Sequence, residues 1–221
     1  MLKIEDLNIN GLKIYQDDQG YCFTSDAVLL SHFAKVKKNE VVADFCSGSG
    51  IVGLNLYGLN QNLISSVTLF EMQPSLFEMS VKSIELNGLQ DKFFAENTRL
   101  QDISKEHYGK YSLIVCNPPY MKKQNGQPNE VASIAICKSE IELSLTQLIN
   151  AISKCLKYGG RTCICHRADR LVDVICTMRE FNMEPKRLQM VYSGKKEPYL
   201  FMVEGVKGGK SSIKVMSPIE N

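Results

Sequence analysis

Two short segments of this sequence combine residue types that are suited to chemistry. The first, which we call the glycine loop, reads Asp44-Phe45-Cys46-Ser47-Gly48-Ser49-Gly50-Ile51-Val52-Gly53. The second, which we call the proline turn, reads Asn117-Pro118-Pro119-Tyr120. Each begins at the end of an apolar run that is typical of a buried strand. Both are therefore predicted to lie at strand ends, where polar groups can meet a ligand.

The glycine loop is predicted to bind a ligand through its backbone. Gly48 and Gly50 allow close approach and positive φ angles, and with Gly53 they match the pattern Gly-x-Gly-x-x-Gly. An ordinary strand-to-helix turn produces the same pattern, so the three glycines alone are a weak signal. Asp44 adds information, because a carboxylate before the loop would repel a pyrophosphate. It could instead hold a cationic amino group, directly or through water.

Glu71 ends the next apolar run, Val67-Thr68-Leu69-Phe70-Glu71. A carboxylate at this strand end can accept hydrogen bonds from both hydroxyls of a ribose. Glu71 alone would serve NAD equally well. Together with Asp44 before the glycine loop, it favours S-adenosylmethionine as the cofactor. An NAD(P)-dependent oxidoreductase remains as an alternative from another class.

The proline turn indicates the reaction. Two prolines end a central strand, but a strand end alone does not require the flanking Asn117 and Tyr120. An exocyclic amine is a poor nucleophile because its lone pair is delocalised into the ring. The Asn117 side-chain carbonyl and the Pro118 backbone carbonyl can accept its two N–H groups and free that lone pair, and the prolines hold both acceptors in place. Tyr120 offers a stacking face for a base. We predict N-methylation, with Asn117, Pro118 and Tyr120 as catalytic residues.

The rest of the sequence alternates strand and helix signals. Short strands around a turn at 17–20 are expected within residues 1–25. Further strands are expected at 40–45, 66–70, 92–95, 111–116, 162–166, 187–192 and 199–204, and helices at 25–34, from 50, at 74–87, 141–156 and 170–181. This alternation predicts an α/β fold with a mostly parallel central sheet and helices on both faces. The last two strands have no helix between them and predict an antiparallel edge hairpin.

The length of 221 residues fits a single domain. We expect an N-terminal extension at 1–38, a core at 39–206 and a basic tail at 207–221. No apolar run approaches the ~20 residues of a membrane span, and no secretory signal is evident, so a cytoplasmic protein is expected. The eight cysteines are then expected to be free thiols without a metal site. The net charge of +2 and several lysine clusters favour an RNA partner only mildly. The oligomeric state stays open.

With both motifs placed, nearly the whole chain resembles the class I Rossmann-like methyltransferases. Within them it is most similar to the bacterial tRNA1(Val) adenine N6-methyltransferase family. The similar segments are 23–30, 44–51, 117–120, 166–171, 184–188 and 203–205. The resemblance implies S-adenosylmethionine as the cofactor and tRNA as the partner. It also implies methylation of adenine N6, with an anticodon-loop adenine of a valine tRNA as the target.

The resemblance, together with the motifs, assigns the site residues. The expected cofactor-binding residues are Thr24, Asp26, Asp44, Cys46, Gly48, Gly50, Glu71, Met72, Asp102 and Asn117. The expected substrate-binding residues are Pro119, Tyr120, Lys122 and Lys138. Three positions depart from the family pattern: Cys46 replaces a glycine, Asp102 lies slightly late for an adenine contact, and Lys138 stands in a run where relatives carry arginine. Lysine lacks the planar fork of a guanidinium group.

Other functions remain possible from the residues alone. A glutamine amide has the same delocalised lone pair, so the proline turn could serve protein glutamine N5-methylation. Adenines of ribosomal RNA or DNA are further candidate substrates. A non-catalytic RNA-binding relative is the alternative outside enzymes.

Overall fold

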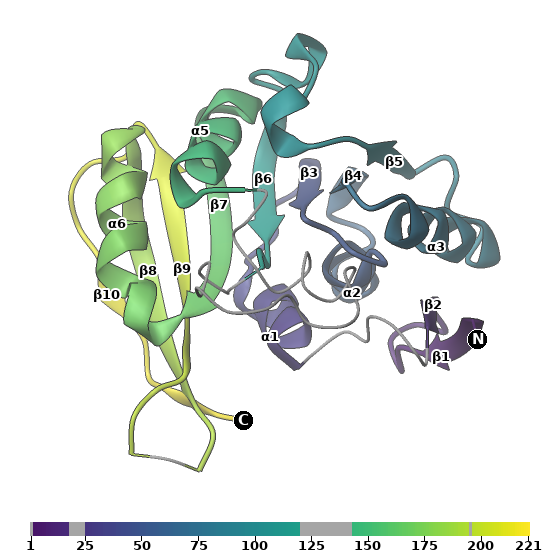
Figure 1. Cartoon of the computed structure of the whole chain (residues 1–221), viewed down its shortest axis with the longest axis horizontal. Coiled ribbons are helices and arrows are strands. Elements are labelled where there is room, and N and C mark those ends of the chain that lie inside the picture. Colours follow the sequence, from purple (N-terminus) through teal and green to yellow (C-terminus); the bar gives the residue numbers. More distant parts are fainter. Residues whose placement is uncertain (1, 18–24, 120–142, 195) are drawn as a thin grey trace, which may run out of the picture.

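The computed structural model describes residues 2–17, 25–119, 143–194 and 196–221. Its main strands are β3 (Glu40–Phe45), β4 (Ile64–Glu71), β5 (Phe93–Asn97), β6 (Tyr111–Cys116), β7 (Leu156–Arg167), β8 (Met183–Tyr192), β9 (Leu200–Lys207), β10 (Lys214–Val215) and β11 (Ile219–Glu220). Among the described residues these nine strands form one sheet in the order β10-β8-β9-β7-β6-β3-β4-β5, with β11 also paired to β8 (Figure 1).

The direction of the strands confirms the predicted sheet. β3 pairs in parallel with both β4 and β6, β4 with β5, and β6 with β7. β9 runs antiparallel to β7 and β8, as expected for the C-terminal hairpin. From β3 the chain moves outward through β4 to β5 and then returns to the other side of β3 as β6. The carboxyl ends of β3 and β6 therefore form a topological switch point, where such sheets bind ligands.

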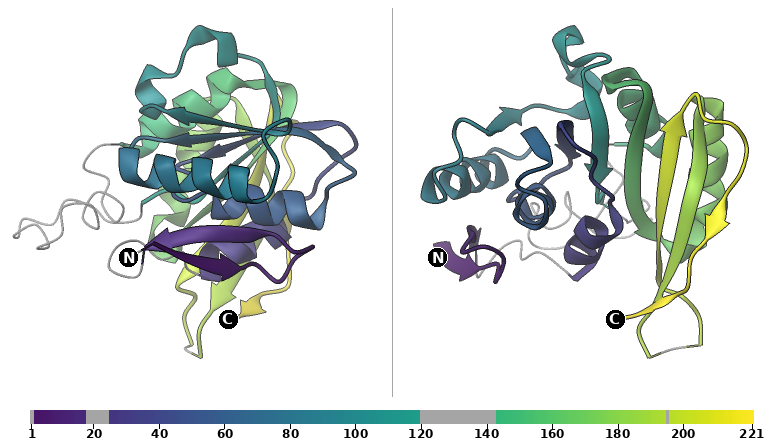
Figure 2. Two further views of the ribbon diagram at one scale, coloured as in Figure 1. Left: turned by 90° about the vertical axis from the view of Figure 1, so that its right-hand side faces the viewer. Right: turned by 180° about the vertical axis from the view of Figure 1, so that it is seen from behind.

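Helices cover both faces of the sheet, as predicted (Figure 2). They are α1 (Ser25–Phe33), α2 (Ile51–Leu59), α3 (Pro74–Leu86), α5 (Leu145–Cys155) and α6 (Leu171–Glu180). The first three contribute to one buried cluster, in which Leu30 and Leu54 pack with Val42 of β3. α5 and α6 contribute to the other, in which Ile149 packs with Ala43 of β3. Neighbouring residues of one strand thus face opposite layers.

Two boundaries differ from those predicted around α5. The helix begins after a capping box, in which the Ser144 hydroxyl accepts from Gln147 N at 3.3 Å and Gln147 Oε1 accepts from Ser144 N at 2.9 Å. It ends at Cys155, close to the predicted end, but β7 starts at Leu156, well before the strand predicted at 162–166. Gly160 lies within this strand, where an added Cβ would meet the Tyr111 carbonyl oxygen at 3.2 Å. The missing side chain at Gly160 lets β6 and β7 approach closely, so this glycine serves the strand and does not end the helix.

The N-terminal extension is a separate two-stranded sheet, β1 (Leu2–Asp6) and β2 (Lys13–Asp17). The turn between these strands lies at residues 7–12, whereas the turn predicted at 17–20 falls largely outside the described residues. The hairpin is attached to α3 by hydrogen bonds: Tyr15 N donates to the Ser83 hydroxyl at 3.0 Å, and Asn87 Nδ2 donates to the Lys13 carbonyl at 2.7 Å. Figure 1 shows it beside α3.

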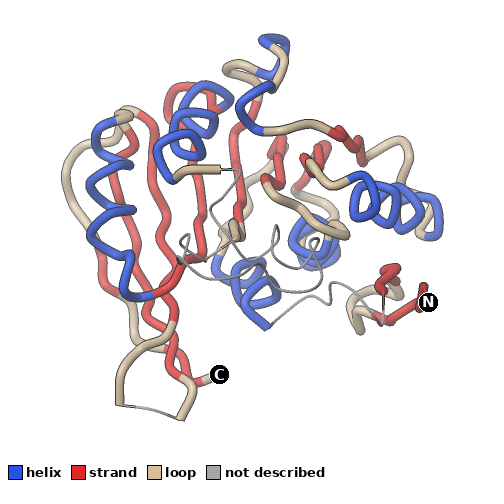
Figure 3. The backbone as a smooth tube through the Cα atoms, viewed as in Figure 1, coloured by secondary structure: helices blue, strands red, loops and turns tan. Residues whose placement is uncertain are grey.

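The segment predicted as a basic tail belongs to the sheet edge. β10 and β11 both pair in parallel with β8, and Figure 3 shows the chain returning along this edge. The last residue is also held, because Asn221 N donates to the Tyr192 carbonyl at 2.9 Å and Asn221 Nδ2 donates to the Tyr199 hydroxyl at 2.7 Å. Exposed side chains here gave no clear strand signal, so the sequence prediction missed the pairing.

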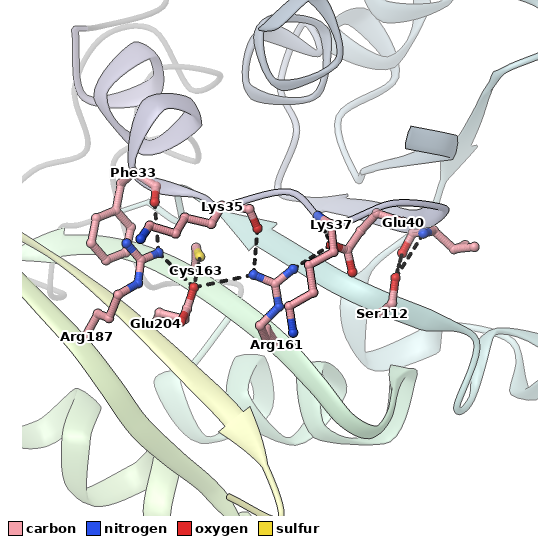
Figure 4. A network of polar contacts seen from close by, with 10 residues as sticks. Phe33, Lys35, Lys37, Glu40, Ser112, Arg161, Cys163, Arg187 and Glu204 are labelled. Carbon is pink, nitrogen blue, oxygen red and sulfur yellow. Dashed lines mark hydrogen bonds and ion pairs between the residues drawn. The ribbon is translucent and has the colours of Figure 1, made fainter. Parts of the chain in front are cut away.

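A buried ion-pair network joins the link before β3 to three strands (Figure 4). It consists of Glu40, Arg161, Arg187 and Glu204. Arg161 Nη2 lies 2.5 Å from Glu40 Oε2, and Arg161 Nη1 lies 3.6 Å from Glu204 Oε2. Arg187 Nη2 donates to Glu204 Oε2 at 2.8 Å and to the Phe33 carbonyl at 2.9 Å. The network therefore fixes the end of α1 and the start of β3 against β7, β8 and β9.

The described cysteines agree with the sequence prediction. All six are free thiols: Cys46, Cys116, Cys155, Cys163, Cys165 and Cys176. Cys163 and Cys165 are buried two residues apart on β7 and contribute to the same core cluster. In the part of the chain that the structure describes, no helix has the length and apolar character needed to span a membrane.

Candidate active site

The glycine loop makes a sharp turn between β3 and α2. The φ angles of Cys46, Gly48 and Gly50 are 57°, 57° and 91°, all in the left-handed region. A Cβ on Gly50 would also lie 3.0 Å from Leu69 Cδ1. Ser47 N donates to the Phe70 carbonyl at 3.1 Å, which places the loop across the end of β4. The predicted close backbone turn is therefore present, with one non-glycine residue, Cys46, in an unfavourable conformation.

Both predicted carboxylates bind the glycine loop itself. Glu71 Oε2 accepts from Gly48 N at 2.9 Å, and Asp44 Oδ2 accepts from Gly53 N at 2.9 Å. Glu71 Oε1 is held from the other side by Gln73 N at 2.8 Å. A Cβ on Gly53 would meet Leu69 Cδ2 at 2.7 Å and Asp44 Oδ2 at 3.3 Å, so a glycine is required there. The two acids thus position the loop in addition to any contact with a ligand.

The electrostatic setting of these acids favours a cationic ligand. Asp44 is fully buried and Glu71 is 6% exposed. Burial raises the pKa of Asp44 to about 8; the Gly53 N–H counters part of this rise, and the nearby Glu71 adds to it. Burial also raises the pKa of Glu71, against the effect of the Gln73, Gly48 and Met72 N–H groups. Neither carboxylate has a basic partner among the residues described. A positive charge at this point would stabilise both ionised forms.

Polar side-chain atoms without a partner gather around the loop. Six buried side-chain N or O atoms have no hydrogen-bond partner within the described residues, and four of them belong to Asp44, Ser47, Ser49 and Asn55. Each such atom costs about 1–3 kcal/mol unless it is satisfied. The two serines and the asparagine were not predicted as site residues. The available signal was Ser49 between two glycines and Ser47 next to one. This set fits a ligand that carries an amino group and hydroxyls, such as S-adenosylmethionine.

The proline turn begins beside the glycine loop. In the sheet, Phe45 of β3 pairs with Phe70 of β4 on one side and with Cys116 of β6 on the other. The next residues are Cys46 after β3, Glu71 at the end of β4 and Asn117 after β6. Asn117 is half-buried. The structure therefore brings both motifs and the second-strand acid to one edge of the sheet, as predicted.

His166 of β7 lies next to the proline turn, on the side of β6 away from the glycine loop. It lines a small cavity with Pro118, Pro119 and Leu148, and it is 1% exposed. Its Nδ1 accepts from Arg167 N at 2.9 Å. Burial, with the positive charge of nearby Arg170, lowers the pKa of His166 to about 4. His166 is therefore neutral at pH 7, and a group with so low a pKa is a weak base.

Comparison with known proteins also indicates a methyltransferase. Residues 24–168 match the model of the methyltransferase small domain family. The chain belongs to this family. A Shewanella protein named tRNA1(Val) (adenine(37)-N6)-methyltransferase is 26% identical over 143 residues, which cover 64% of this chain and 58% of the relative. A Flavobacteriaceae bacterium protein of the same name is 24% identical over 200 residues, covering 83% and 81%. The chain thus spans 58% of the first relative's length.

Solved structures confirm the predicted Rossmann-like methyltransferase fold. A predicted O-methyltransferase of Agrobacterium tumefaciens superposes with a TM-score of 0.69 at 16% identity, covering 89% of this chain and 88% of the neighbour. TYW2 of M. jannaschii, in complex with AdoMet, gives a TM-score of 0.66 at 12% identity, covering 93% and 85%. The family match supports S-adenosylmethionine over a nicotinamide dinucleotide, in agreement with the acids at the glycine loop.

The remaining predicted residues of this methyltransferase small domain stay predictions. Asp26 is half-buried on α1 and accepts from the Tyr199 hydroxyl at 3.1 Å, which gives it a structural partner. Met72 follows Glu71 and is half-buried, whereas Asp102 is exposed in the short helix η1 (Leu100–Asp102). Thr24, Tyr120, Lys122 and Lys138 lie outside the described residues.

Proposed function

We propose that this chain transfers a methyl group from S-adenosylmethionine to N6 of an adenine in tRNA, with an anticodon-loop adenine of a valine tRNA as the target. The observation that carries this proposal is the adjacency of Glu71, the glycine loop and Asn117 at one sheet edge. The acids favour a cationic donor, and the proline turn favours an exocyclic amine as acceptor. The names of the relatives support adenine N6 and tRNA.

The proposed reaction divides the work between two loops. When bound, S-adenosylmethionine supplies an electrophilic methyl group on a sulfonium centre. The glycine loop, held by Asp44 and Glu71, binds and orients that group. The Asn117 side-chain oxygen and the Pro118 carbonyl accept the two N–H groups of the amine, which localises its lone pair. The nitrogen–methyl bond forms as the sulfur–methyl bond breaks, the sulfur leaves as a neutral thioether, and the methylated nitrogen loses one proton to solvent. Because a thioether is a good leaving group, accurate placement contributes more than a strong base.

The substrate assignment is best tested by transfer of a labelled methyl group. The enzyme would be offered total tRNA, ribosomal RNA, DNA and a release factor in parallel, followed by nucleoside and amino acid analysis. We expect label in N6-methyladenosine from tRNA. Label in glutamine of the release factor would instead support protein N5-methylation. Label in ribosomal RNA or DNA would move the target to another nucleic acid.

The role of the proline turn is tested at Asn117. Asn117→Ala removes one acceptor, and we expect about a 10²- to 10³-fold loss of kcat, the scale seen when one preorganised polar contact to a reacting group is lost. Asn117 is also expected to contact the cofactor, but cofactor affinity, measured by calorimetry, should fall much less than kcat. Asn117→Asp retains an acceptor and should keep more activity than the alanine variant. Asn62→Ala, an exposed asparagine in the turn before β4, is the control. An unchanged rate in Asn117→Ala would refute the assigned role.

A further inference from the structure

A second recess lies along the side of α5, away from the glycine loop. It has a volume of about 140 Å³ and separates α5 from the segment between β5 and β6, which contains η1 and the short helix η2 (Lys105–His107). Its lining residues are Leu100, Gln101, Ile103, Tyr108, Gln147, Asn150, Ala151, Lys154 and Cys155. Figure 1 shows α5 facing the teal segment that precedes β6. We call this recess the α5 groove.

The lining of the α5 groove combines buried apolar side chains with side-chain amides. Leu100, Ile103 and Cys155 are buried and form an apolar base. The rest of the lining contributes three side-chain amides, from Gln101, Gln147 and Asn150. The Asn150 amide can donate to and accept from the polar edges of a base, and Gln147, whose oxygen caps α5, can still donate through Nε2. The apolar base of the groove suits a flat ring.

An aromatic ring and a cation stand together at one end of the groove. Lys154 Nζ lies 5.8 Å from the centre of the Tyr108 ring. Gly109 N donates to the Lys154 carbonyl at 2.9 Å, which holds the segment against the helix. The Tyr108 side chain is 42% exposed. An exposed ring beside a lysine offers stacking to a base and charge to the adjoining phosphate.

The α5 groove and the cavity beside the proline turn lie along the same helix, α5. Ser144 and Leu148 border the cavity next to Pro118 and Pro119. Gln147, where the α5 groove begins, lies within one turn of both. Lys154 is seven residues further, or about 10 Å along the helix axis. Tyr108 and Lys154 lie near the amino ends of β6 and β7, whereas the proline turn follows the carboxyl end of β6. An RNA strand that places one base at the proline turn would therefore run along α5 and bring a nucleotide several positions away into the groove.

We propose that the α5 groove binds an unpaired nucleotide of the RNA substrate, several positions along the strand from the target base. The proposal rests on the proposed function and adds to it a second contact with a single-stranded loop. Asp102 lies on η1 with Gln101, and Glu106 lies on η2 with Lys105. These two acids limit the positive charge beside the groove. Stacking on Tyr108 and hydrogen bonds to the amides therefore provide more of the contact than charge does.

The first test is RNA binding measured by fluorescence anisotropy, without any methyl transfer. The probes are a labelled RNA stem-loop with adenines in its loop and a fully paired duplex of the same composition. Tyr108→Ala should weaken stem-loop binding about 10-fold or more and leave duplex binding unchanged. Tyr158→Ala is the matched control, because Tyr158 is 77% exposed and lies outside the groove. Equal effects of the two variants, or equal loss for both probes, would overturn the proposal.

The second test separates charge from stacking. Lys154→Met should reduce the dependence of stem-loop binding on salt, lowering the slope of log K against log salt by about 0.7. Lys82→Met, on the exposed side of α3, should leave the slope unchanged. Calorimetry should show unaltered S-adenosylmethionine affinity in all variants. If wild-type protein methylates no RNA, the proposed function fails, while the binding data still decide the groove separately.

Discussion

The two ends of strand β3 carry the same kind of residue in opposite circumstances. Glu40 and Asp44 are four residues apart, so their side chains face the same side of the sheet. They are 4% and 0% exposed. Glu40 Oε2 meets the guanidinium of Arg161 and accepts from Lys37 N at 2.7 Å. Asp44 accepts only from Gly53 N, and its other oxygen has no partner among the described residues.

This difference separates a structural acid from one that awaits a ligand. A buried carboxylate is costly unless a counter-charge or hydrogen bonds compensate it. At the start of β3 the chain supplies the counter-charge itself, and the same holds for Glu204 with Arg187. At the end of β3 the chain supplies Asp44 with only the backbone N–H of Gly53. Glu71, at the end of β4, is held by backbone N–H groups and the Gln73 side chain. The missing positive charge is the one that an S-adenosylmethionine ligand would bring.

The largest effect is expected when Glu40, at the start of β3, loses its ion-pair partner Arg161. Arg161→Met leaves Glu40 buried without its cation, and we expect a loss of about 3–5 kcal/mol of unfolding free energy. Urea denaturation at neutral pH measures it. S-adenosylmethionine affinity of the folded fraction should stay within a factor of two or so of wild type, since no network residue lines the glycine loop.

A second substitution keeps this prediction sharp. Adding Glu40→Gln to Arg161→Met removes the orphaned charge and should recover part of the lost stability. A loss below about 1 kcal/mol in the single variant would mean that the pair of Glu40 and Arg161 contributes no more than a surface ion pair, and it would remove the contrast between the two ends.

The site was more predictable than the support that holds it. The sequence located the glycine loop, the proline turn and Glu71 because each sits at the end of an apolar run, which is a local signal. The ion-pair network was not predicted, since its members lie on four separate segments and no spacing relates them. The extra length of β7 was missed because Gly159-Gly160 is also typical of a helix end. Here close strand packing requires Gly160, and only the tertiary structure reveals that.

The pairing of the last residues was equally hidden. β10 and β11 are two residues each, too short for a periodic pattern, and most of their side chains are exposed. The role of Asp44 in holding Gly53 was also missed, because the acid was considered only as a ligand contact. Local sequence signals thus predicted which strands end at the site. Contacts between residues far apart in the sequence hold those strands in place, and they left no local signal.

The uncompensated end should reveal itself in the pH dependence of stability. The folded-state pKa of Asp44 is about 8, above its ordinary value of 3.8. The folded protein therefore retains a proton that the unfolded chain has lost, and this stabilisation is lost as pH rises toward 8. Between pH 5 and 8, ligand-free wild type should lose roughly 2–4 kcal/mol relative to Asp44→Asn. Urea titrations of both proteins at several pH values provide the measurement. Parallel pH profiles would show that Asp44 is already compensated.

Ligand binding should remove this proton. At pH 7 the Asp44 carboxyl is mostly protonated in the free protein, and a cationic amino group nearby would lower its pKa. S-adenosylmethionine binding should then release up to about one proton, as seen by calorimetry in buffers with different ionisation enthalpies. Asp44→Asn should release none and should bind about 10-fold more weakly, or about 1.4 kcal/mol. Equal proton release by both proteins would assign the effect to another group.

The smallest effect concerns the turns that flank β3. Asn39 and Cys46 both have positive φ, 60° and 57°, but asparagine tolerates this conformation and cysteine does not. Asn39→Gly should therefore change stability by only a few tenths of a kcal/mol. At position 46, where an alanine substitution removes the thiol and keeps the Cβ, Cys46→Gly should be more stable than Cys46→Ala by about 1 kcal/mol. Thermal unfolding of the variants gives these differences. A Cys46→Ala protein as stable as Cys46→Gly would mean that the site end of β3 stores no backbone strain, and its cost would then lie in the buried acids alone.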